Sequence, residues 1–378
     1  MKCIRVRVPK EPLVYTEDEP IPKPPKGGAV VKIAFAGVCH TDLHFWEGGF
    51  TKDSGEMDTN FGFKYPCSPG HEIAGTVFSL DESVADGGEG GLRLGDPVVV
   101  FPWIYCGVCK ACKAGYNDVC DGSPQSFIGL TQDGGFEEYV AVQDVRYLVP
   151  TGSIPLDVAC MLPCSGLTAF HAVEEGLDFT KFIMETKGNC SVLVLGAGGL
   201  GQWALRFARA LCPPGTQVIC ADVKPDALNV VAKIVPGVDT VVIPRDQSSE
   251  DTAGQIKALT HNGYGVDLVL DFVGATQTYQ VGRHSLRTHG HYHVIGLLGG
   301  ESRFHLPSMI WHGIQMKGIM VGGLVRLKRL IQFVLNKPDV YDNLQFKIYP
   351  LEEGIQVMEN LAKGKVVGRS ILRCADGK

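Results

Sequence analysis

The sequence contains no apolar run as long as the ~18 residues that a membrane-spanning helix requires. Lys and Arg are scattered rather than clustered, and the formal net charge is −6, so no nucleic-acid partner is expected. Residues 1–10 alternate like a strand and lack the apolar core of a secretory signal. These absences predict a cytoplasmic protein that acts on a small molecule, with no membrane and no nucleic-acid partner.

Evenly spaced cysteines and internal repeats are also missing, although the 378 residues include thirteen cysteines. An odd number of cysteines at uneven spacing is typical of a reducing compartment, where clustered cysteines more often bind metal or catalyse than form disulfides. At roughly 100–200 residues per domain, the length of the chain predicts two or three domains, and two is the favoured number.

The pattern of apolar residues along the sequence changes near residue 155. Residues 1–150 hold short β-like runs separated by Gly and Pro, which predicts a barrel-like all-β unit with a Gly-rich surface loop at 82–91. Later apolar runs of buried-strand length alternate with helical patterns, and they lie at 191–195, 217–221, 267–272 and 291–296. This alternation predicts an α/β unit whose parallel sheet is covered on both faces.

A glycine-rich turn of the form GxGxxG follows the first of these apolar runs. Gly196 allows a tight turn, Gly198 lets the backbone approach a pyrophosphate, and Gly201 lets a helix pack on a strand. Asp222 ends the next strand, where it can accept hydrogen bonds from ribose hydroxyls and repel a 2′-phosphate. The context favours a dinucleotide site over a turn without ligand, and it predicts NAD rather than NADP.

Four cysteines in the pattern CxxCxxCx7C form the densest cluster of the chain: Cys106, Cys109, Cys112 and Cys120. Four thiolates close a tetrahedral zinc site and leave no position for substrate, so such a site is structural. Ferredoxin-type iron–sulfur runs share the CxxCxxC spacing. The longer gap before Cys120 and the absence of a following Pro favour zinc.

Other ligand-type residues are dispersed. Cys39 lies in the segment GVCHTDLH, His71 precedes Glu72, and Cys164 lies in LPCSG. Each of them, taken alone, is typical of an ordinary core residue.

Together these motifs resemble the zinc-dependent medium-chain alcohol dehydrogenases over nearly the whole chain. GVCHTDLH, Gly70-His71-Glu72, the four-cysteine cluster, LPCSGLTA and GAGGLG with Asp222 occur in the order of that family. The resemblance implies a GroES-like β-barrel catalytic domain at 1–165 with a structural-zinc lobe at about 103–122. It also implies a Rossmann doubly wound parallel-sheet coenzyme domain at 166–320 and a C-terminal return to the catalytic domain at 321–378.

The resemblance assigns metal ligands and catalytic residues. Cys39, His71 and Cys164 would bind a catalytic zinc with its fourth position open, a ligand set known from alcohol dehydrogenase. With the four-cysteine site, this implies two zinc ions per chain. The implied catalytic residues are Thr41, which contacts the alcohol, His44, which ends a proton relay, Asp42, which orients His71, and Glu72.

The resemblance also implies NAD-binding residues, substrate residues and oligomerisation as a homodimer or homotetramer. The NAD-binding set comprises His40, Gly196, Gly198, Gly199, Leu200, Gly201, Asp222, Lys224 and Arg369. Cys164 and the intact four-cysteine lobe favour primary or aromatic alcohols over sugars. Aromatic residues fall at pocket positions of the family, with an ordinary place in the barrel core as the alternative: Trp46, Phe50 and Trp103.

Some readings stay open at this point. The connection 51–65 is longer than is usual in the family, and its aromatic residues predict a lid. The stretch 319–325 suits an interface or a core, and the basic face of a helix at 326–335 is predicted to be solvated. A cinnamyl-alcohol-type NADP-dependent dehydrogenase is one alternative, against which Asp222 counts. A non-catalytic zinc-bound scaffold is another.

Overall fold

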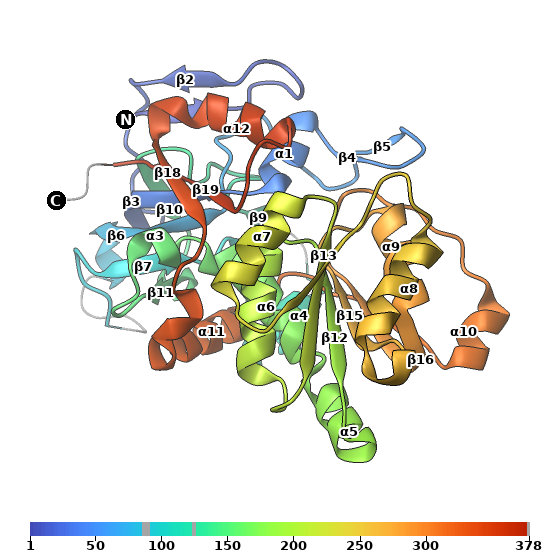
Figure 1. The fold of residues 1–378 in the computed structure, drawn as a ribbon. Coiled ribbons are helices and arrows are strands. Elements are labelled where there is room, and N and C mark those ends of the chain that lie inside the picture. Colours follow the sequence, from blue (N-terminus) through green and yellow to red (C-terminus); the bar gives the residue numbers. More distant parts are fainter. Residues whose placement is uncertain (85–90, 123–125, 376–378) are drawn as a thin grey trace.

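The computed structural model describes residues 1–84, 91–122 and 126–375, and it forms a mainly β domain beside an α/β domain (Figure 1). Most of the predicted loop at 82–91 lies outside the described residues. Among the described residues, no helix is long and apolar enough to cross a membrane.

The β domain, called the catalytic domain below, is built on a largely antiparallel sheet. Its strands run in the order β11 (Leu148–Pro150), β7 (Pro97–Val100), β6 (Glu72–Leu80), β3 (Ala29–Val38), β19 (Arg369–Arg373) and β18 (Phe346–Pro350), and β10 (Tyr139–Val142) also pairs with β3. Smaller pairs are β1 (Cys3–Arg5) with β2 (Val14–Thr16), β4 (Phe50–Thr51) with β5 (Met57–Asp58), and β8 (Trp103–Ile104) with β9 (Ser126–Phe127). The strands β18 and β19, from the end of the chain, thus lie in the same sheet as β3, from its first forty residues.

The helices associated with the catalytic domain are short. They are α1 (His40–Glu47), α2 (Lys110–Lys113), α3 (Leu156–Ala159) and α12 (Gly354–Ala362). Three further helices connect or flank the two domains: α4 (Leu167–Glu174), α5 (Leu177–Lys187) and α11 (Leu324–Asn336).

The α/β domain, called the coenzyme domain below, contains an all-parallel sheet. Its order is β14 (Asp239–Val242), β13 (Gln217–Asp222), β12 (Ser191–Leu195), β15 (Val266–Asp271), β16 (Leu286–Val294) and β17 (Gln315–Gly318). This is the order of the doubly wound dinucleotide-binding fold, so the predicted α/β fold class is confirmed. The sequence pattern does not predict β14 and β17, because these edge strands are short and largely exposed.

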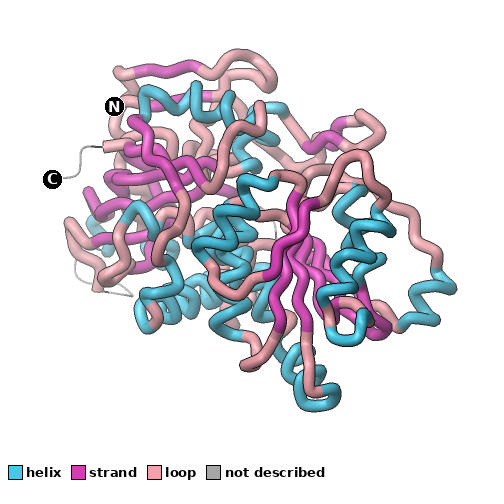
Figure 2. Tube along the Cα trace, viewed as in Figure 1, coloured by secondary structure: helices cyan, strands magenta, loops and turns pink. Residues whose placement is uncertain are grey.

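Helices cover both faces of the parallel sheet (Figure 2). On β12, Val192 and Val194 pack in one core with α6 (Gly199–Leu211) and α7 (Pro225–Ile234), while Leu193 and Leu195 face α8 (Ser249–Leu259) and α9 (Thr276–Ser285). One more helix of this domain, α10 (Leu306–His312), lies beyond β16 (Figure 1). The first of these cores is continuous with the core of the catalytic domain, so one apolar cluster joins the two domains.

A buried histidine in this framework predicts a loss of stability in acid. His293 on β16 is 3% exposed, its Nδ1 lies 3.2 Å from the Ala172 carbonyl oxygen, and burial lowers its pKa to about 4. An unfolded histidine titrates near ~6.5. The unfolded chain therefore gains a proton first, and the unfolding free energy should fall by about 1.4 kcal/mol per pH unit between pH ~6.5 and ~4.

The measurement is urea unfolding at a series of pH values. His293→Asn keeps a donor for the Ala172 carbonyl but does not titrate. The unfolding free energy of this variant should therefore fall less steeply as the pH is lowered, because its unfolding takes up one proton fewer. Parallel pH profiles for the two proteins would contradict the assignment.

Candidate active site

Potential metal ligands from distant parts of the chain converge beside the catalytic sheet. Cys39 caps α1, His71 and Glu72 lie at the start of β6, and Cys164 lies in a π-helical turn, Leu162–Gly166. Their donor atoms lie within 4.8 Å of one another, and all four side chains are buried. Two sulfurs and an imidazole are the donors that zinc prefers, so the group fits a zinc ion.

Asp42 fixes the orientation of two of these ligands. It is fully buried, and its carboxylate accepts the N–H of Cys39 at 2.8 Å and that of Gly70 at 3.1 Å. Its Oδ1 also lies 3.0 Å from Nδ1 of His71. With Nδ1–H donating to this carboxylate, Nε2 of His71 is left for the metal position, 3.2 Å from Cys164 Sγ.

Glu72 is the remaining member of the group, and Arg369 holds it. The buried Glu72 carboxylate forms an ion pair with Arg369 of β19 and accepts the Ser165 N–H at 3.1 Å. Burial raises the pKa of Glu72, and Arg369 limits the rise. The two partners are 297 positions apart in the chain, and no sequence pattern predicts their contact.

The protonation preferences of the site distinguish Cys39 from the other two ligands. The hydrogen bond from Cys164 lowers the pKa of the Cys39 thiol well below its usual value, and His71 acts in the same direction. The same contact, together with burial, raises the pKa of Cys164. Burial would lower the pKa of His71, but Asp42 and Cys39 together outweigh it and the net pKa is raised. Cys39 therefore favours the thiolate, which is the metal-binding form.

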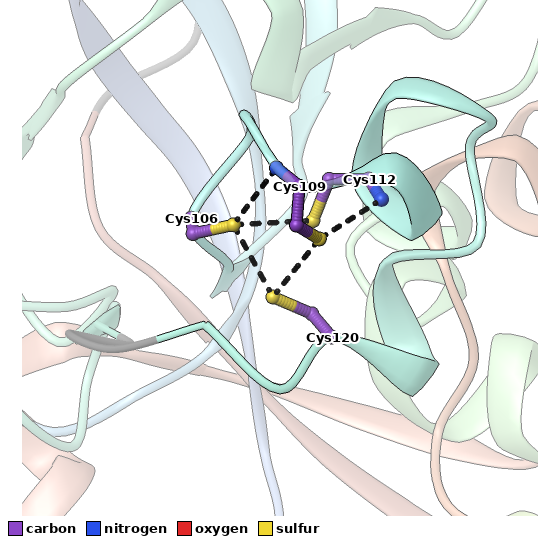
Figure 3. A group of neighbouring side chains, drawn as sticks. All are labelled: Cys106, Cys109, Cys112 and Cys120. Atoms are coloured by element: carbon purple, nitrogen blue, oxygen red, sulfur yellow. Dashed lines mark hydrogen bonds between the residues drawn. The ribbon is translucent and has the colours of Figure 1, made fainter.

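The four-cysteine cluster has the dimensions of a zinc tetrahedron. Zn–S bonds of about 2.3 Å at tetrahedral angles place sulfurs about 3.8 Å apart. The Cys106 sulfur lies 3.9 Å from the Cys112 sulfur and 3.5 Å from the Cys120 sulfur. The sulfurs of Cys109 and Cys120 are 3.8 Å apart (Figure 3). The N–H groups of Cys109 and Cys112 point at neighbouring sulfurs, each at 3.4 Å. These residues fit a closed structural site.

The lobe that carries these cysteines is fastened to α11. Asn117 Oδ1 accepts the N–H of Leu324 at 3.3 Å, and Asp118 pairs with Arg326 at 3.0 Å. Arg326 also pairs with Glu174 of α4 at 2.9 Å. The prediction that the basic face of this helix is solvated is therefore wrong for Arg326, because acidic residues from two other segments surround it.

The glycine-rich turn connects β12 to α6. Gly196 has φ +100°, and a Cβ on Gly201 would lie 1.8 Å from the Gly196 carbonyl oxygen, so neither position tolerates a side chain. A Cβ on Gly198 would meet no atom within 4 Å, which leaves open space at the N-terminus of α6. Gly199 and Leu200 form its first turn, and the side chain of Arg369 packs against Gly199.

Asp222 lies at the end of β13, beside the turn. Its carboxylate accepts the N–H of Ala197 at 2.6 Å and that of Lys224 at 2.8 Å. A carboxylate has about four acceptor positions, so capacity for ribose hydroxyls remains. The Lys224 ammonium donates to the Gly364 carbonyl at 2.8 Å, which links the coenzyme domain to the C-terminal segment.

The other polar residues of GVCHTDLH lie on α1. The hydroxyl of Thr41 is 3.8 Å from Cys39 Sγ, and His40 is exposed. The ring of His44 packs 4.4 Å from that of Phe50, and its Nδ1 lies 3.7 Å from the Glu47 carboxylate. Within the described part of the chain, no hydrogen bond joins Thr41 to His44 directly.

The candidate pocket aromatics lie in different surroundings. Trp103 is 5% exposed, its ring is 5.4 Å from that of His71, and its Nε1–H donates to the Pro163 carbonyl at 3.1 Å. The indole of Trp46 instead donates to the Glu11 carbonyl at 2.7 Å. Phe127, which the sequence pattern does not single out, packs 5.7 Å from Trp103.

The long connection 51–65 contributes an aromatic cluster. Phe61 packs 4.2 Å from Phe50 and is 47% exposed. Phe63 and Tyr65 pack against the buried Phe45, and the Tyr65 hydroxyl donates to the Phe45 carbonyl at 2.6 Å. Phe61 therefore packs on the same Phe50 ring that contacts His44.

A sulfur- and imidazole-lined metal centre beside a dinucleotide-binding sheet defines the class of zinc-type dehydrogenases. The alcohol dehydrogenase GroES-like domain matches residues 25–153, and the zinc-binding dehydrogenase domain matches 199–336. The chain belongs to the zinc-dependent medium-chain alcohol dehydrogenase family, and the expected GroES-like catalytic domain is confirmed.

Named relatives agree with this membership. An NAD-dependent alcohol dehydrogenase of Sulfurisphaera tokodaii is 33% identical over 377 residues, covering 98% of this chain and 99% of its own. L-galactonate-5-dehydrogenase of Escherichia coli is 33% identical over 308 residues, covering 81% and 79%. The crystal structure of the Aeropyrum pernix alcohol dehydrogenase superposes with a TM-score of 0.81 at 30% identity, covering 99% and 100%.

Proposed function

We propose that this enzyme transfers hydride between NAD(H) and an alcohol with its aldehyde or ketone, that it prefers primary or aromatic alcohols, and that it holds two zinc ions per chain. The observation that carries the proposal is the convergence of Cys39, His71 and Cys164, with Asp42 behind His71. When bound, zinc acidifies an alcohol hydroxyl and NAD accepts the hydride.

The chain's own residues supply orientation and a proton path. Asp42 holds His71 in one tautomer, and Trp103 forms an apolar wall 5.4 Å from that imidazole. The Thr41 hydroxyl, 3.8 Å from Cys39 Sγ, would accept the proton of the alcohol. His44 would release the proton to solvent, and no direct hydrogen bond links His44 to Thr41 in the described chain. The ribose hydroxyls of a coenzyme, when bound, would supply hydrogen-bonding groups between the two residues.

Three features support the assignment of the coenzyme site. Open space lies at Gly198, at the N-terminus of α6, where a helix attracts a phosphate. Arg369 packs against the same turn, and its buried Nε has no hydrogen-bond partner among the described residues. That atom is a donor available to a pyrophosphate. Asp222 supplies the acceptors for ribose hydroxyls.

The proposed function is tested by NADH absorbance with a panel of alcohols, alongside metal analysis. We expect turnover with NAD⁺ on primary or aromatic alcohols and two zinc ions per chain. Sugars and sugar acids belong in the panel, because one relative carries the name of a galactonate dehydrogenase. Tighter binding of NADPH than of NADH would contradict the choice of coenzyme, and absence of turnover would favour a scaffold.

Asp222→Asn should reduce the preference for NADH. The substitution keeps one oxygen for the Ala197 N–H but removes the charge that strengthens hydrogen bonds to the ribose. We expect the Kd of NADH to rise about tenfold, while the Kd of NADPH stays the same or falls. Asp226→Asn on the neighbouring α7 is the charge-matched control. Equal weakening for both coenzymes would argue against ribose recognition by Asp222.

We also propose that the chain forms a homodimer through the edge of the coenzyme domain. β17 is the last strand in its sheet, and exposed edges invite pairing. Large apolar side chains are exposed on the segment 297–311, which precedes β17 in the chain, and we call these residues the edge patch: Leu297, Leu298, Phe304, Leu306, Ile310 and Trp311. Trp311 is 85% exposed and Ile310 81%. In the stretch left open between core and interface, Ile319 is buried and Met320 is exposed.

Light scattering should give the mass of at least two 40.8 kDa chains for the native protein. Trp311→Lys should shift it toward the monomer, because a charge would be buried in an apolar contact. Tyr264→Lys, at an aromatic residue that is 58% exposed outside the edge patch, is the control. A monomeric native protein at micromolar concentration would refute the proposal.

A further inference from the structure

The hairpin formed by β4 and β5 reaches from the catalytic domain to the coenzyme domain (Figure 1). Near its tip, the N–H of Asp53 donates to the Gly299 carbonyl at 3.1 Å, and the N–H of Ser54 donates to the Glu301 carboxylate at 3.1 Å. Both acceptors follow β16. The hairpin therefore bonds to the opposite domain through its main chain.

A side-chain contact reinforces these bonds. The hydroxyl of Thr276, the first residue of α9, lies within hydrogen-bond distance of the Asp53 carboxylate and 2.6 Å from the Glu301 carbonyl oxygen. The same hydroxyl accepts the N–H of Glu301 at 3.0 Å. Thr276 thus ties the hairpin tip to two turns of the coenzyme domain at once.

The backbones also approach closely. Gly299 has φ +92°, and a Cβ at this position would lie 1.9 Å from the Thr51 carbonyl oxygen. Only glycine permits both the conformation and the contact. The turn after β16 is therefore shaped to receive the hairpin.

The position of the hairpin contact in the coenzyme domain indicates its function. Thr276 follows the carboxyl end of β15, and Gly299 and Glu301 follow that of β16. Open parallel sheets bind their ligands outside the carboxyl ends of the strands. The hairpin therefore bonds to the end of the parallel sheet at which a dinucleotide would bind.

We propose that the hairpin at 50–58 is a clasp across the coenzyme cleft, and that Asp53 and Thr276 are positioning residues that set how fast the coenzyme enters and leaves. The clasp rests on the proposed function, since it acts on the coenzyme. Neither residue needs to touch the coenzyme, because the contact holds the two domains together whether or not a ligand lies between them.

This arrangement predicts a particular kinetic signature. If the coenzyme passes only while the clasp is open, a weaker clasp raises the association and dissociation rates by the same factor. The Kd then changes little as long as the closed form predominates. A lost coenzyme contact would raise the dissociation rate alone, and general loosening of the fold would weaken binding.

The test uses Thr276→Val, which keeps the shape of the side chain and removes the hydroxyl, and Asp53→Ala. Stopped-flow NADH fluorescence should show both rate constants about two- to tenfold higher, with a Kd within about twofold of the native value. Glu56→Gln is the matched control, because it removes the 2.9 Å pair with Lys52 inside the same hairpin and leaves the contacts between domains intact. Unchanged rates, or a weaker Kd with an unchanged association rate, would overturn the clasp.

Amide hydrogen exchange provides a readout that needs no coenzyme. In free Thr276→Val, exchange at Asp53 and Ser54 should accelerate by the same two- to tenfold factor, while exchange in β12 stays native-like. Failure of the native protein to bind NADH would refute the proposed function, and the exchange data would then decide whether the two domains are clasped. Native-like exchange at both amides would reject the clasp itself.

Discussion

Cys39→Ala is expected to lower kcat/KM by about 10³-fold or more and to leave one zinc ion per chain. Cys39 supplies the thiolate of the candidate catalytic site, because contacts with Cys164 and His71 lower its pKa. Metal polarisation of an alcohol is worth several kcal/mol in the transition state, and about 1.4 kcal/mol corresponds to a factor of ten in rate. The measurement combines steady-state kinetics with metal analysis of the purified protein.

Cys160→Ala is the matched control for this experiment. Cys160 is fully buried in the same domain, four residues before Cys164, and its thiol contacts the Asp157 carbonyl rather than the ligand group. The control should keep both zinc ions and near-native kcat/KM. A Cys39→Ala protein that retains two zinc ions and turns over normally would disprove the ligand assignment.

Cys112→Ser is expected to lower the thermal stability of the protein rather than its catalytic activity. A closed four-sulfur site contributes its metal-binding free energy to folding, and losing it amounts to several kcal/mol. For a protein of this size, about 1 kcal/mol moves Tm by roughly 2–4 °C, so Tm should fall by about 10 °C. Calorimetry measures the shift, and kcat/KM at low temperature should change far less than in Cys39→Ala.

Destabilisation should extend beyond the lobe itself. Asn117 and Asp118 fasten the lobe to α11 through Leu324 and Arg326, so release of the lobe should also raise hydrogen exchange at the start of α11. Val108→Ser changes a 70% exposed side chain between two ligands and serves as the control. If Cys112→Ser kept its native Tm although its zinc was lost, the site would not be structural.

Local patterns predict much of this molecule. The apolar runs that became β12, β13 and β15 are buried from end to end or nearly so, and the glycine turn has a distinctive spacing. Burial on both faces produces a continuous apolar run, which is readable without a structure. The edge strands β14 and β17 carry no such run, since solvent reaches them, and this is why the pattern misses them.

Long-range pairing limits what can be read at the candidate site. The four-cysteine cluster spans fifteen residues, so its geometry follows from spacing. The contact of Arg369 with Glu72, and that of Thr276 with Asp53, join residues 297 and 223 positions apart. Which carboxylate meets which partner depends on how the two domains pack. No local periodicity contains that information.

The strand order of the catalytic sheet governs when the enzyme can be completed during its synthesis. β19, the last strand of the chain, lies between β3 and β18 and carries Arg369, the partner of Glu72. Domains tend to fold in the order in which they leave the ribosome. Here the coenzyme domain has all its strands by residue 318, whereas the sheet that begins at residue 29 waits for residues 369–373. The second domain can therefore mature first, and a chain that stops before residue 369 lacks the strand that closes the first.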